Sequence, residues 1–334
     1  LLKKEGYDVT GVYMKNWSGD DFGIQADCPW EQEMEDVKKV CKVLDIPFMS
    51  FNFEKEYREK VVNYFFEEYE KGRTPNPDVM CNREIKFDMF LNKALDEGAE
   101  GIATGHYAQV IKKNYKYELH KGKDSNKDQT YFLYTLNQEQ LSKTLFPIGH
   151  LEKSEVRKLA HEFNLPVADK KDSQGICFIG EIDVREFLRN AIEGKPGNIV
   201  DADTGKVIGK HDGVMYYTIG QREGLQIGGA PEPYYVVGKD AEKKEIYAAM
   251  GKNNPELMKN ELDLENLHLI SGEAPETIFE KKLTGAIRYR KTPEVLTIDK
   301  NLHVTFEKPQ RAVAPGQSLV IYDGEICLGG GIIK

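Results

Sequence analysis

The sequence predicts an α/β domain with a parallel sheet over residues 1–194, followed by a mostly-β half of small barrel-like domains. Two observations predict this division. In the first half, short strand-like runs alternate with segments of helical periodicity, which is typical of parallel sheets. After Lys195-Pro196-Gly197 the helical periodicity nearly disappears, and short β-type runs repeat around turn signals. A break in the β pattern near residues 272–277 predicts two domains in this second half, over residues 195–274 and 275–334.

The elements of the first half follow from periodicity and turn signals. Residues 1–5 look like the last turn of a helix with Gly6 as its C-cap, so we expect the natural start of the domain to lie upstream of Leu1. The remaining pattern predicts strands over 7–14 and 46–51, a strand from 101 that runs into the turn Thr104-Gly105-His106, and a hairpin strand over 117–123. It predicts helices around 37–44, 54–69, 78–95, 138–143, 154–163 and 184–192.

Composition excludes several classes of protein. The 334 residues are 40% hydrophobic and 30% charged and carry a formal net charge of −9, which is typical of a soluble globular protein. No apolar run approaches the ~18 residues that a membrane helix needs, and no signal peptide is recognisable, so we expect no membrane partner. The five cysteines form no CxxC pair, which argues against a disulfide scaffold or a zinc knuckle and fits a reducing cytoplasm, bacterial or organellar.

The stretch from Gly72 to Phe87, GRTPNPDVMCNREIKF, is the first candidate site. Its prolines exclude a helix before Asp78, and helical periodicity begins after it, so Asp78 is the predicted N-cap. Cys81 would then lie in the first turn, where free N–H groups and the helix dipole favour the thiolate. The same run could also be purely structural, since Asp is an ordinary cap and a first-turn cysteine is often inert.

A second cysteine, Cys177, lies in a short apolar segment bracketed by Gly175 and Gly180. Two thiols in one domain could form a catalytic disulfide or pass a sulfur atom. The alternative is that Cys177 is a core residue of a strand, which the surrounding apolar residues also permit.

Two basic spans suggest a nucleic acid partner on this otherwise acidic chain. The first contains six lysines, and the second contains Tyr289 between two arginines, a combination suited to stacking on a base while binding phosphate. The alternative is an ordinary solvated hairpin face. The spans are Lys112, Lys113, Lys116, Lys121, Lys123 and Lys127, and Lys281, Lys282, Arg288, Arg290 and Lys291.

Other signals are weak or missing. His106 follows a glycine at a strand end, where a ligand could lie, but the histidines show no metal-ligand spacing, so no metal site is expected. The sequence contains neither GxGxxG nor GxxxxGK[ST], which disfavours a Rossmann dinucleotide site and a Walker-type NTPase.

Several motifs, taken together and in order, closely resemble the tRNA-specific 2-thiouridylases, the ATP-dependent enzymes of the MnmA/TrmU type. The likeness spans essentially the whole chain. It rests on the stretch from Gly72 to Phe87 and on ATGHYA (103–108), KDQTYFL (127–133), FPIGHLEKSEVR (146–157), DSQGICFIGE (172–181), GKHDGVMYYTIGQREGLQIGG (209–229) and the ending GQSLVIYDGEICLGGGII.

The resemblance implies a fold and a reaction. The α/β half would be an adenine-nucleotide hydrolase domain of the PP-loop ATP pyrophosphatase kind. With ATP, and Mg²⁺ as its expected companion, it would adenylate the C2 oxygen of the wobble uridine in tRNAs for Lys, Glu and Gln. A persulfide on Cys177, supplied by a sulfur-relay donor protein, would then deliver the sulfur, and Cys81 would be the partner that can form a disulfide with Cys177.

The same resemblance assigns further residues of this sequence. Asp78 matches the proposed acid/base aspartate, and Asn76-Pro77-Asp78 the segment that meets the target base. Met14 and Gly105 match adenine-nucleotide contacts. The implied tRNA contacts are Lys127, Asp128, Gln129, Arg288, Tyr289 and Arg290.

One departure from the family pattern affects the expected activity. The family's nucleotide signature, SGGVDSS, does not occur in this sequence. A chain that really lacked it should bind ATP poorly and turn over little. Two alternatives therefore stand beside sulfur transfer: another PP-loop ATP pyrophosphatase that acts on a small molecule, and a non-catalytic tRNA-binding protein that lacks the nucleotide loop.

Overall fold

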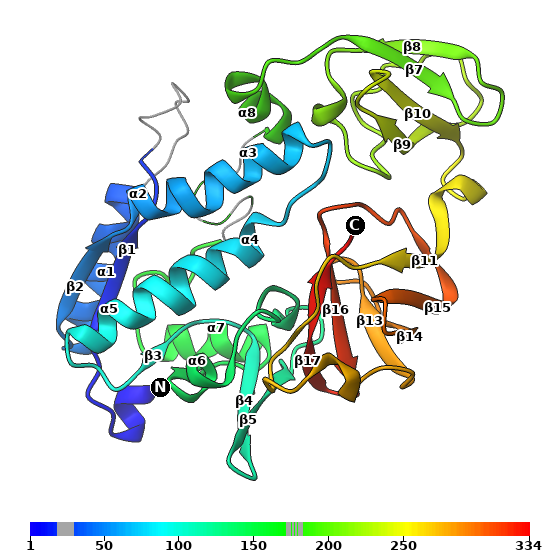
Figure 1. Ribbon diagram of the computed structural model, residues 1–334. Coiled ribbons are helices and arrows are strands. Elements are labelled where there is room, and N and C mark those ends of the chain that lie inside the picture. The colour runs from blue at the N-terminus through cyan, green and yellow to red at the C-terminus, as the bar shows by residue number, and fades with distance from the viewer. Residues whose placement is uncertain (19–29, 172–174, 176, 178, 180–182) are drawn as a thin grey trace.

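The computed structural model describes residues 1–18, 30–171, 175, 177, 179 and 183–334. Figure 1 shows three parts: an N-terminal part with helices around short strands, a small β domain made of β7 to β10, and a larger β domain that contains the C-terminus. The predicted order, α/β first and mostly β afterwards, is confirmed. Among the described residues, no helix is both long and apolar enough to span a bilayer.

Parallel strand pairs form the centre of the N-terminal part. Strand β1 (Gly11–Lys15) pairs in parallel with β2 (Phe48–Asn52), and the helix α1 (Trp30–Leu44) lies between them in the chain. Strand β3 (Ile102–Ala103) pairs in parallel with β6 (Thr144–Leu145). Within the described residues these are two separate two-stranded sheets. The parallel α/β arrangement is as predicted, although the sequence pattern did not indicate β6.

Two long helices cover this part, and each changes its winding along its length. The first consists of α2 (Glu54–Tyr57), a π-helical segment η3 (Arg58–Val62) and α3 (Asn63–Glu70). The second consists of α4 (Pro77–Met80), the π-helical segment η4 (Cys81–Phe90) and α5 (Leu91–Asp96). Their buried faces meet in the large hydrophobic core, with Tyr57 and Cys81 among its fully buried members. Both helices lie within two residues of their predicted bounds.

The hairpin of β4 (Ala108–Lys113) and β5 (Lys116–Lys121) joins the N-terminal part to the C-terminal sheet. β5 pairs antiparallel with β17 (Ile326–Ile332), so one sheet is shared by the two parts. Its turn, Asn114-Tyr115, has positive φ at both residues, as a two-residue type I′ turn requires. Figure 1 shows the tip of this hairpin projecting away from the rest of the chain.

The β half consists of two sheets. The smaller has the order β8-β7-β10-β9, and the larger runs β11-β15-β14-β13-β16-β17-β5-β4, with β12 against β17. The bounds are β7 (Gly197–Asp201), β8 (Val207–His211), β9 (Tyr234–Asp240), β10 (Glu245–Met250), β11 (Met258–Asp263), β12 (His268–Leu269), β13 (Leu283–Ala286), β14 (Glu294–Ile298), β15 (His303–Arg311) and β16 (Ser318–Asp323). The other elements are α6 (Gln138–Ser142), α7 (Lys153–Glu162), α8 (Val184–Ala191), η1 (Leu2–Glu5), η5 (Thr130–Phe132), η6 (Val214–Tyr216), η7 (Pro255–Leu257) and η8 (Pro275–Thr277).

The boundary predicted at residues 274/275 lies too late in the chain. Strands β11 and β12 pair with β15 and β17, so they belong to the C-terminal sheet, which also has its own hydrophobic core. The two β sheets therefore divide between Met250 and Met258. The sequence signal near residues 272–277 is a turn at Gly272 and a short 3-10 segment inside the larger β domain.

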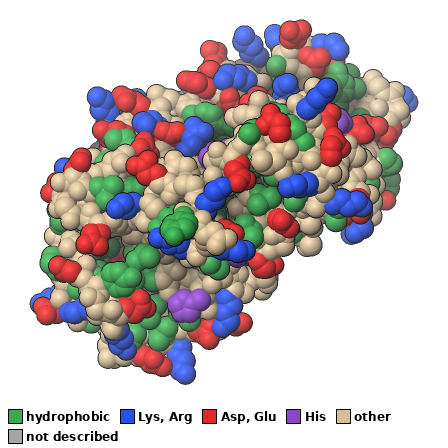
Figure 2. Space-filling model, turned by 60° about the horizontal axis from the view of Figure 1, so that its bottom comes forward, with side chains coloured by type: hydrophobic (Ala, Val, Ile, Leu, Met, Phe, Trp, Pro, Cys, Tyr) green, Lys and Arg blue, Asp and Glu red, His purple; other side chains and the backbone are tan. Residues whose placement is uncertain are grey.

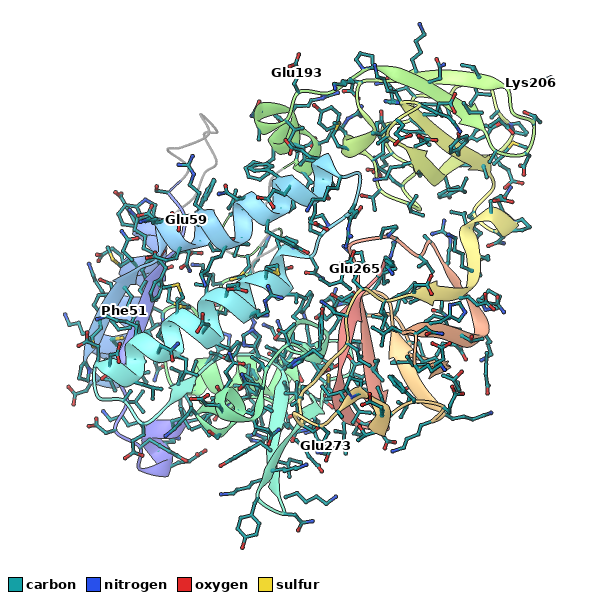
Figure 3. All side chains as sticks on the ribbon, in the orientation of Figure 1. Phe51, Glu59, Glu193, Lys206, Glu265 and Glu273 are labelled. Atoms are coloured by element: carbon teal, nitrogen blue, oxygen red, sulfur yellow. The ribbon has the colours of Figure 1, made fainter. Side chains whose placement is uncertain are left out.

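Charges of both signs are interspersed over the face of the molecule in Figure 2. Many of the lysines in the first basic span have an acidic partner: Lys116 pairs with Glu273, labelled in Figure 3, at 2.6 Å, and Lys123 pairs with Glu155 at 2.9 Å. These pairs agree with the alternative interpretation of this span as a solvated hairpin face. They also reduce the positive charge available for phosphate groups.

A close approach at Gly330 gives a test of how tightly the N-terminal and C-terminal parts are packed. A Cβ added there would lie 2.9 Å from the Tyr134 ring and would also meet the Leu319 carbonyl oxygen. We expect Gly330→Ala to lower the free energy of unfolding by about 1–3 kcal/mol through overpacking. Chemical denaturation measures the change.

The matched control is Gly228→Ala, where an added Cβ meets no described atom within 4 Å and φ is not positive. Equal stability of the two variants would contradict the packing seen at Gly330.

Candidate active site at the two cysteines

Cys81 and Cys177 lie side by side, although 96 positions separate them in the chain. Their Sγ atoms are 3.8 Å apart, and both are free thiols, so the disulfide implied by the resemblance is not formed here. Cys81 is fully buried and Cys177 is half-buried. Cys177 lies in a turn, not in a strand, and several of its neighbours in the chain lie outside the described residues.

The helix that carries Cys81 begins two residues earlier than predicted. Asn76 is the N-cap: its Oδ1 accepts a hydrogen bond from the Val79 N–H at 3.2 Å, and Pro77 occupies the first helical position. The N–H of Cys81 is already bonded to the carbonyls of Pro77 and Asp78. Cys81 therefore lies beyond the free N–H groups of the helix start, and the prediction that Asp78 is the cap is wrong.

The charge on the pair is the reverse of the sequence-based expectation. Burial, the hydrogen bond to Cys177 and the charge on Cys177 raise the pKa of the Cys81 thiol well above its usual value. The hydrogen bond from Cys81, together with the Lys86 ammonium, lowers the pKa of Cys177 to about 7 although burial opposes the shift. Cys177 is thus the more acidic thiol of the pair and Cys81 its hydrogen-bond donor, so the prediction that Cys81 is the favoured thiolate is wrong.

Two polar contacts hold the backbone of Cys177. Its N–H donates to Oδ1 of Asp78 at 3.0 Å, and its carbonyl accepts a hydrogen bond from the Tyr57 hydroxyl at 2.6 Å. Burial raises the pKa of Asp78, while the bond from Cys177 and the charge of Lys86 act in the opposite direction. Asp78, which the sequence analysis singled out, therefore connects the two cysteine segments.

Lys86 completes the group, and the sequence analysis did not find it. It is half-buried, and its ammonium hydrogen-bonds the Cys177 sulfur. Burial lowers the pKa of Lys86, but the nearby sulfurs and Asp78 outweigh this and raise it above the usual value. At 3.6 residues per turn, Lys86 would lie roughly 140° around the helix from Cys81. The i→i+5 bonding of a π-helix turns the fifth residue back toward the first.

Aromatic side chains gather near the start of this helix. Tyr131 hydrogen-bonds the Asn76 side chain, and the rings of Phe132 and Tyr289 lie 4.5 Å apart between centroids. The Arg290 guanidinium lies over the Tyr289 ring at 5.1 Å, with a positive φ of 60° at Arg290. Tyr289 and Arg290, two of the predicted tRNA contacts, thus lie close to the predicted base-contacting segment.

Other predicted tRNA contacts have structural partners. Arg288 donates to the carbonyls of Ile219 at 3.0 Å and Ala312 at 2.9 Å, which connects the two β domains. Oδ1 of Asp128 accepts hydrogen bonds from the N–H groups of Gly122 and Thr130.

Gln129 also supports this loop, since its side-chain oxygen accepts a bond from the Tyr107 N–H at 3.0 Å. Lys127, in the same loop, is half-buried. Contact of Lys127, Asp128, Gln129 and Arg288 with tRNA stays a prediction.

The residues assigned to the adenine nucleotide lie at strand ends, as predicted. Met14 is the last residue but one of strand β1, and Gly105 lies two residues after the end of strand β3. Gly105 is exposed, and among the described residues a Cβ there would meet only Ile148, at 4.0 Å. His106 beside it is buried, bonded through Nδ1 to Thr104 Oγ1 at 2.7 Å, and burial lowers its pKa well below the usual value. The described residues contain no cluster of His, Cys, Asp and Glu that could hold a metal ion.

Both β domains hold the loop that leads into the helix of Cys81. The Thr74 N–H donates to the Pro315 carbonyl at 2.8 Å, and the Gln317 amide donates to the carbonyls of Thr74 and Pro75 at 2.9 and 3.0 Å. Thr74 Oγ1 also bonds Thr218 Oγ1 at 3.1 Å.

An ion pair supports the same loop. Arg73 pairs with Glu68 and with Glu265, which Figure 3 labels where the C-terminal domain approaches the helices. The loop is therefore fixed from three sides.

Three family models match successive parts of the chain. Residues 1–181 match the family described as "tRNA methyl transferase HUP domain", residues 185–250 the "tRNA methyl transferase PRC-barrel domain", and residues 259–333 the "Aminomethyltransferase beta-barrel domain". The second and third matches also separate between residues 250 and 259, in agreement with the sheets.

Full-length relatives are about half identical to this chain. A "tRNA-specific 2-thiouridylase MnmA" of Halalkalibacterium halodurans is 50% identical, with 100% of this chain and 90% of the relative covered. "tRNA-specific 2-thiouridylase MnmA 2" of Geobacillus kaustophilus is 51% identical with the same coverage. The protein of this name in Nitrosomonas eutropha is 50% identical, and 93% of it is covered.

The hydrogen bond between the two sulfurs gives a test of their unequal charge. Because a hydrogen bond to the thiolate lowers its pKa, we expect Cys81→Ala to raise the pKa of Cys177 above about 7. The rate of Cys177 alkylation by iodoacetamide, followed by mass spectrometry between pH 5 and 10, gives the midpoint. Above its midpoint the thiolate dominates, so the curve for Cys81→Ala should move to higher pH.

Cys81→Ser is the control, because it keeps a hydroxyl donor at the same position. An identical midpoint in the wild-type chain and in Cys81→Ala would show that Cys81 does not stabilise the thiolate.

Proposed function

The chain belongs to the family of tRNA-specific 2-thiouridylases, and we propose that Cys177 and Cys81 carry out the transfer of sulfur to the wobble uridine of tRNA. It is a sulfur-transferring enzyme that acts on a uridine of tRNA. The observation that carries the assignment of the cysteines is the 3.8 Å contact between their Sγ atoms, with Cys177 as the thiolate of the pair.

The reaction exchanges a carbonyl oxygen for sulfur, and this requires a leaving group, since oxide cannot depart. ATP use agrees with the HUP domain that the chain matches. The uridine C2 oxygen attacks the α-phosphate of ATP, and pyrophosphate leaves. The oxygen can then depart as part of AMP when sulfur attacks C2. Met14 and Gly105 would contact the adenine nucleotide from the strand ends.

Sulfur arrives on Cys177. Its thiolate attacks the outer sulfur of a persulfide on a donor protein, a new S–S bond forms, and the donor leaves as a thiolate. The outer sulfur of the Cys177 persulfide then attacks C2 of the adenylated uridine, and AMP leaves with the electrons of the broken C–O bond. The uridine is now joined to Cys177 through a disulfide.

Cys81 resolves this intermediate. Its sulfur attacks Sγ of Cys177, the Cys81–Cys177 disulfide forms, and 2-thiouridine leaves with the electrons of the broken S–S bond. A dithiol reductant later restores both thiols. Cys81 must lose its proton for this step, and Asp78, whose charge acts on Cys81 and whose pKa burial raises, is the proposed base.

The helix start and the aromatic pair would receive the target base. A base inside a stacked anticodon cannot reach two buried sulfurs, so it must leave the stack. Asn76 and Pro77 lie at the helix start beside Asp78, and the half-buried rings of Phe132 and Tyr289 are suited to stacking. Arg290 is exposed and can contact phosphate.

The other candidate functions are less well supported. The two alternatives raised by the sequence are not favoured, since the relatives are named thiouridylases and a small-molecule ligase or a pure binder needs no paired thiols. Methyl transfer, which appears in the descriptions of the matching families, requires one nucleophile and a methyl donor. The resolving position of Cys81 has no part in such a reaction.

The decisive experiment is single-turnover thiolation of a tRNA transcript with ATP and glutathione persulfide. From a version of the chain that carries the SGGVDSS segment upstream, we expect 2-thiouridine and AMP in equal amounts. In that version, Cys177→Ser should lower thiolation at least about 10³-fold because the nucleophile is gone. Cys81→Ser should still form the Cys177 persulfide but release little product. The assay is run on this chain and on a version that carries the SGGVDSS segment upstream.

The matched control is Cys41→Ala, a buried cysteine of α1 outside the site. Normal thiolation by Cys177→Ser would refute the assignment of the sulfur carrier. Persistent tRNA binding without thiolation in both chain versions would favour the non-catalytic binder.

A further inference from the structure

We propose that Lys86 is a catalytic residue whose ammonium donates a hydrogen bond to Sγ of Cys177 and keeps that sulfur anionic for the attack on the incoming persulfide. The inference rests on the proposed function, because it names the group that prepares the sulfur-carrying cysteine. It adds to that function a residue that neither the sequence pattern nor the comparisons single out.

The register of the helix is the first argument. Asp78, Cys81 and Lys86 are separated by three and five positions. Three positions place Asp78 and Cys81 on one face of a regular helix, but five positions do not. The π-helical segment begins at Cys81 and returns Lys86 to this face. π-helical turns are rare and occur frequently at functional sites, which agrees with a functional reason for this winding.

The surroundings of Lys86 are the second argument. Among the described residues, the charged and titratable groups around Lys86 are Cys81 and Asp78 on its own helix, Cys177 on the facing turn, and His106, whose pKa is lowered by burial and by the charge of Lys86. Since His106 is neutral, one lysine and one aspartate surround two sulfurs. With Cys177 as the thiolate, the positive charge of Lys86 balances the sulfur while Asp78 binds the Cys177 N–H.

Other cations on the same helix behave differently. Arg83 pairs with Glu84, and Lys93 pairs with Glu97 at 2.7 Å, both at the surface. Lys60, from the neighbouring helix, bridges to Glu84 and Asp88. These are ordinary surface ion pairs. Within the part of the chain that the structure describes, Lys86 differs from these cations because its ammonium contacts a sulfur, that of Cys177.

The chemical role follows from the first step of sulfur transfer. The electron pair on Cys177 Sγ forms the new S–S bond to the outer sulfur of the donor persulfide, and the donor thiolate takes the electrons of the bond that breaks. Lys86 keeps its proton throughout. Its positive charge raises the fraction of Cys177 that is thiolate near neutral pH, so it favours the reactive form before the donor arrives.

The test is the pH dependence of Cys177 alkylation by iodoacetamide in the wild-type chain and in Lys86→Met. The pKa of Cys177 is about 7, so its thiol is about half ionised at pH 7 in the wild-type chain. Because a neighbouring positive charge lowers a thiol pKa by about one unit or more, we expect alkylation at pH 7 to fall at least about fivefold, with the rate at pH 10 unchanged. A merely structural role of Lys86 would alter the rate at both pH values or at neither. The control is Lys93→Met, which removes a surface lysine from the same helix.

Circular dichroism and thermal unfolding show whether Lys86→Met folds. If it does not fold, Lys86→Gln takes its place in the same assay, because glutamine keeps a polar head group without the charge. An unchanged alkylation profile in a folded Lys86 variant would overturn the proposal. Persulfide formation on Cys177 from glutathione persulfide, without tRNA or ATP, should fall in parallel with alkylation at pH 7. These two assays contain no uridine, so failure of thiolation alone would count against the proposed function and leave the role of Lys86 standing.

Discussion

The structure of the site depends on keeping one sulfur anionic in a place that water reaches only partly. An isolated buried charge is costly, so it must be paired and hydrogen-bonded. For Cys177 the partners are the Cys81 thiol and the Lys86 ammonium, and both come from one helix. The backbone of Cys177 is fixed separately by Asp78 and by Tyr57 of the other long helix. Moving any of these groups would change the charge of the sulfur, so the two long helices and the turn of Cys177 form one unit.

The β domains contribute to this unit through the loop before Asn76. The backbone of Thr74 and Pro75 is bound by Pro315 and Gln317, and the Thr74 side chain by Thr218 of the smaller β domain. In addition, a hairpin of the N-terminal part continues the C-terminal sheet. Through these contacts the β domains help to fix the residues that begin the helix of Cys81.

Sequence reasoning identified most of the elements and singled out Asp78, Cys81 and Cys177, but it did not give the charges of the two cysteines. Periodicity gave the two long helices to within two residues, because amphipathic patterns are local. It was less accurate elsewhere, since α1 begins seven residues before its predicted start and β1 four residues after. The cap was misplaced by two residues, since Asn and Asp are both good caps, and Pro77 at the first helical position was the signal that distinguishes them. Cys81 was assigned the thiolate because the helix dipole can be inferred from sequence and burial cannot. Lys86 was missed because periodicity arguments assume 3.6 residues per turn, and nothing local indicates a π-helix.

In the proposed reaction, the unequal exposure of the two cysteine residues and their unequal pKa values set the order in which they act. A donor protein carries its persulfide on a side chain that must reach the accepting sulfur, and Cys81 has no exposed surface at all. Cys177 is half-buried and has the lower pKa of the pair, about 7, so the proposed reaction lets sulfur enter there. In the proposed reaction the raised pKa of Cys81 keeps its proton in place until Cys177 has delivered the sulfur, which disfavours early closure of the disulfide because a thiol is a poor nucleophile. The hydrogen bond that lowers the pKa of Cys177 is the same one that keeps the proton on Cys81, and a single contact between two sulfurs thus separates the accepting role from the resolving role.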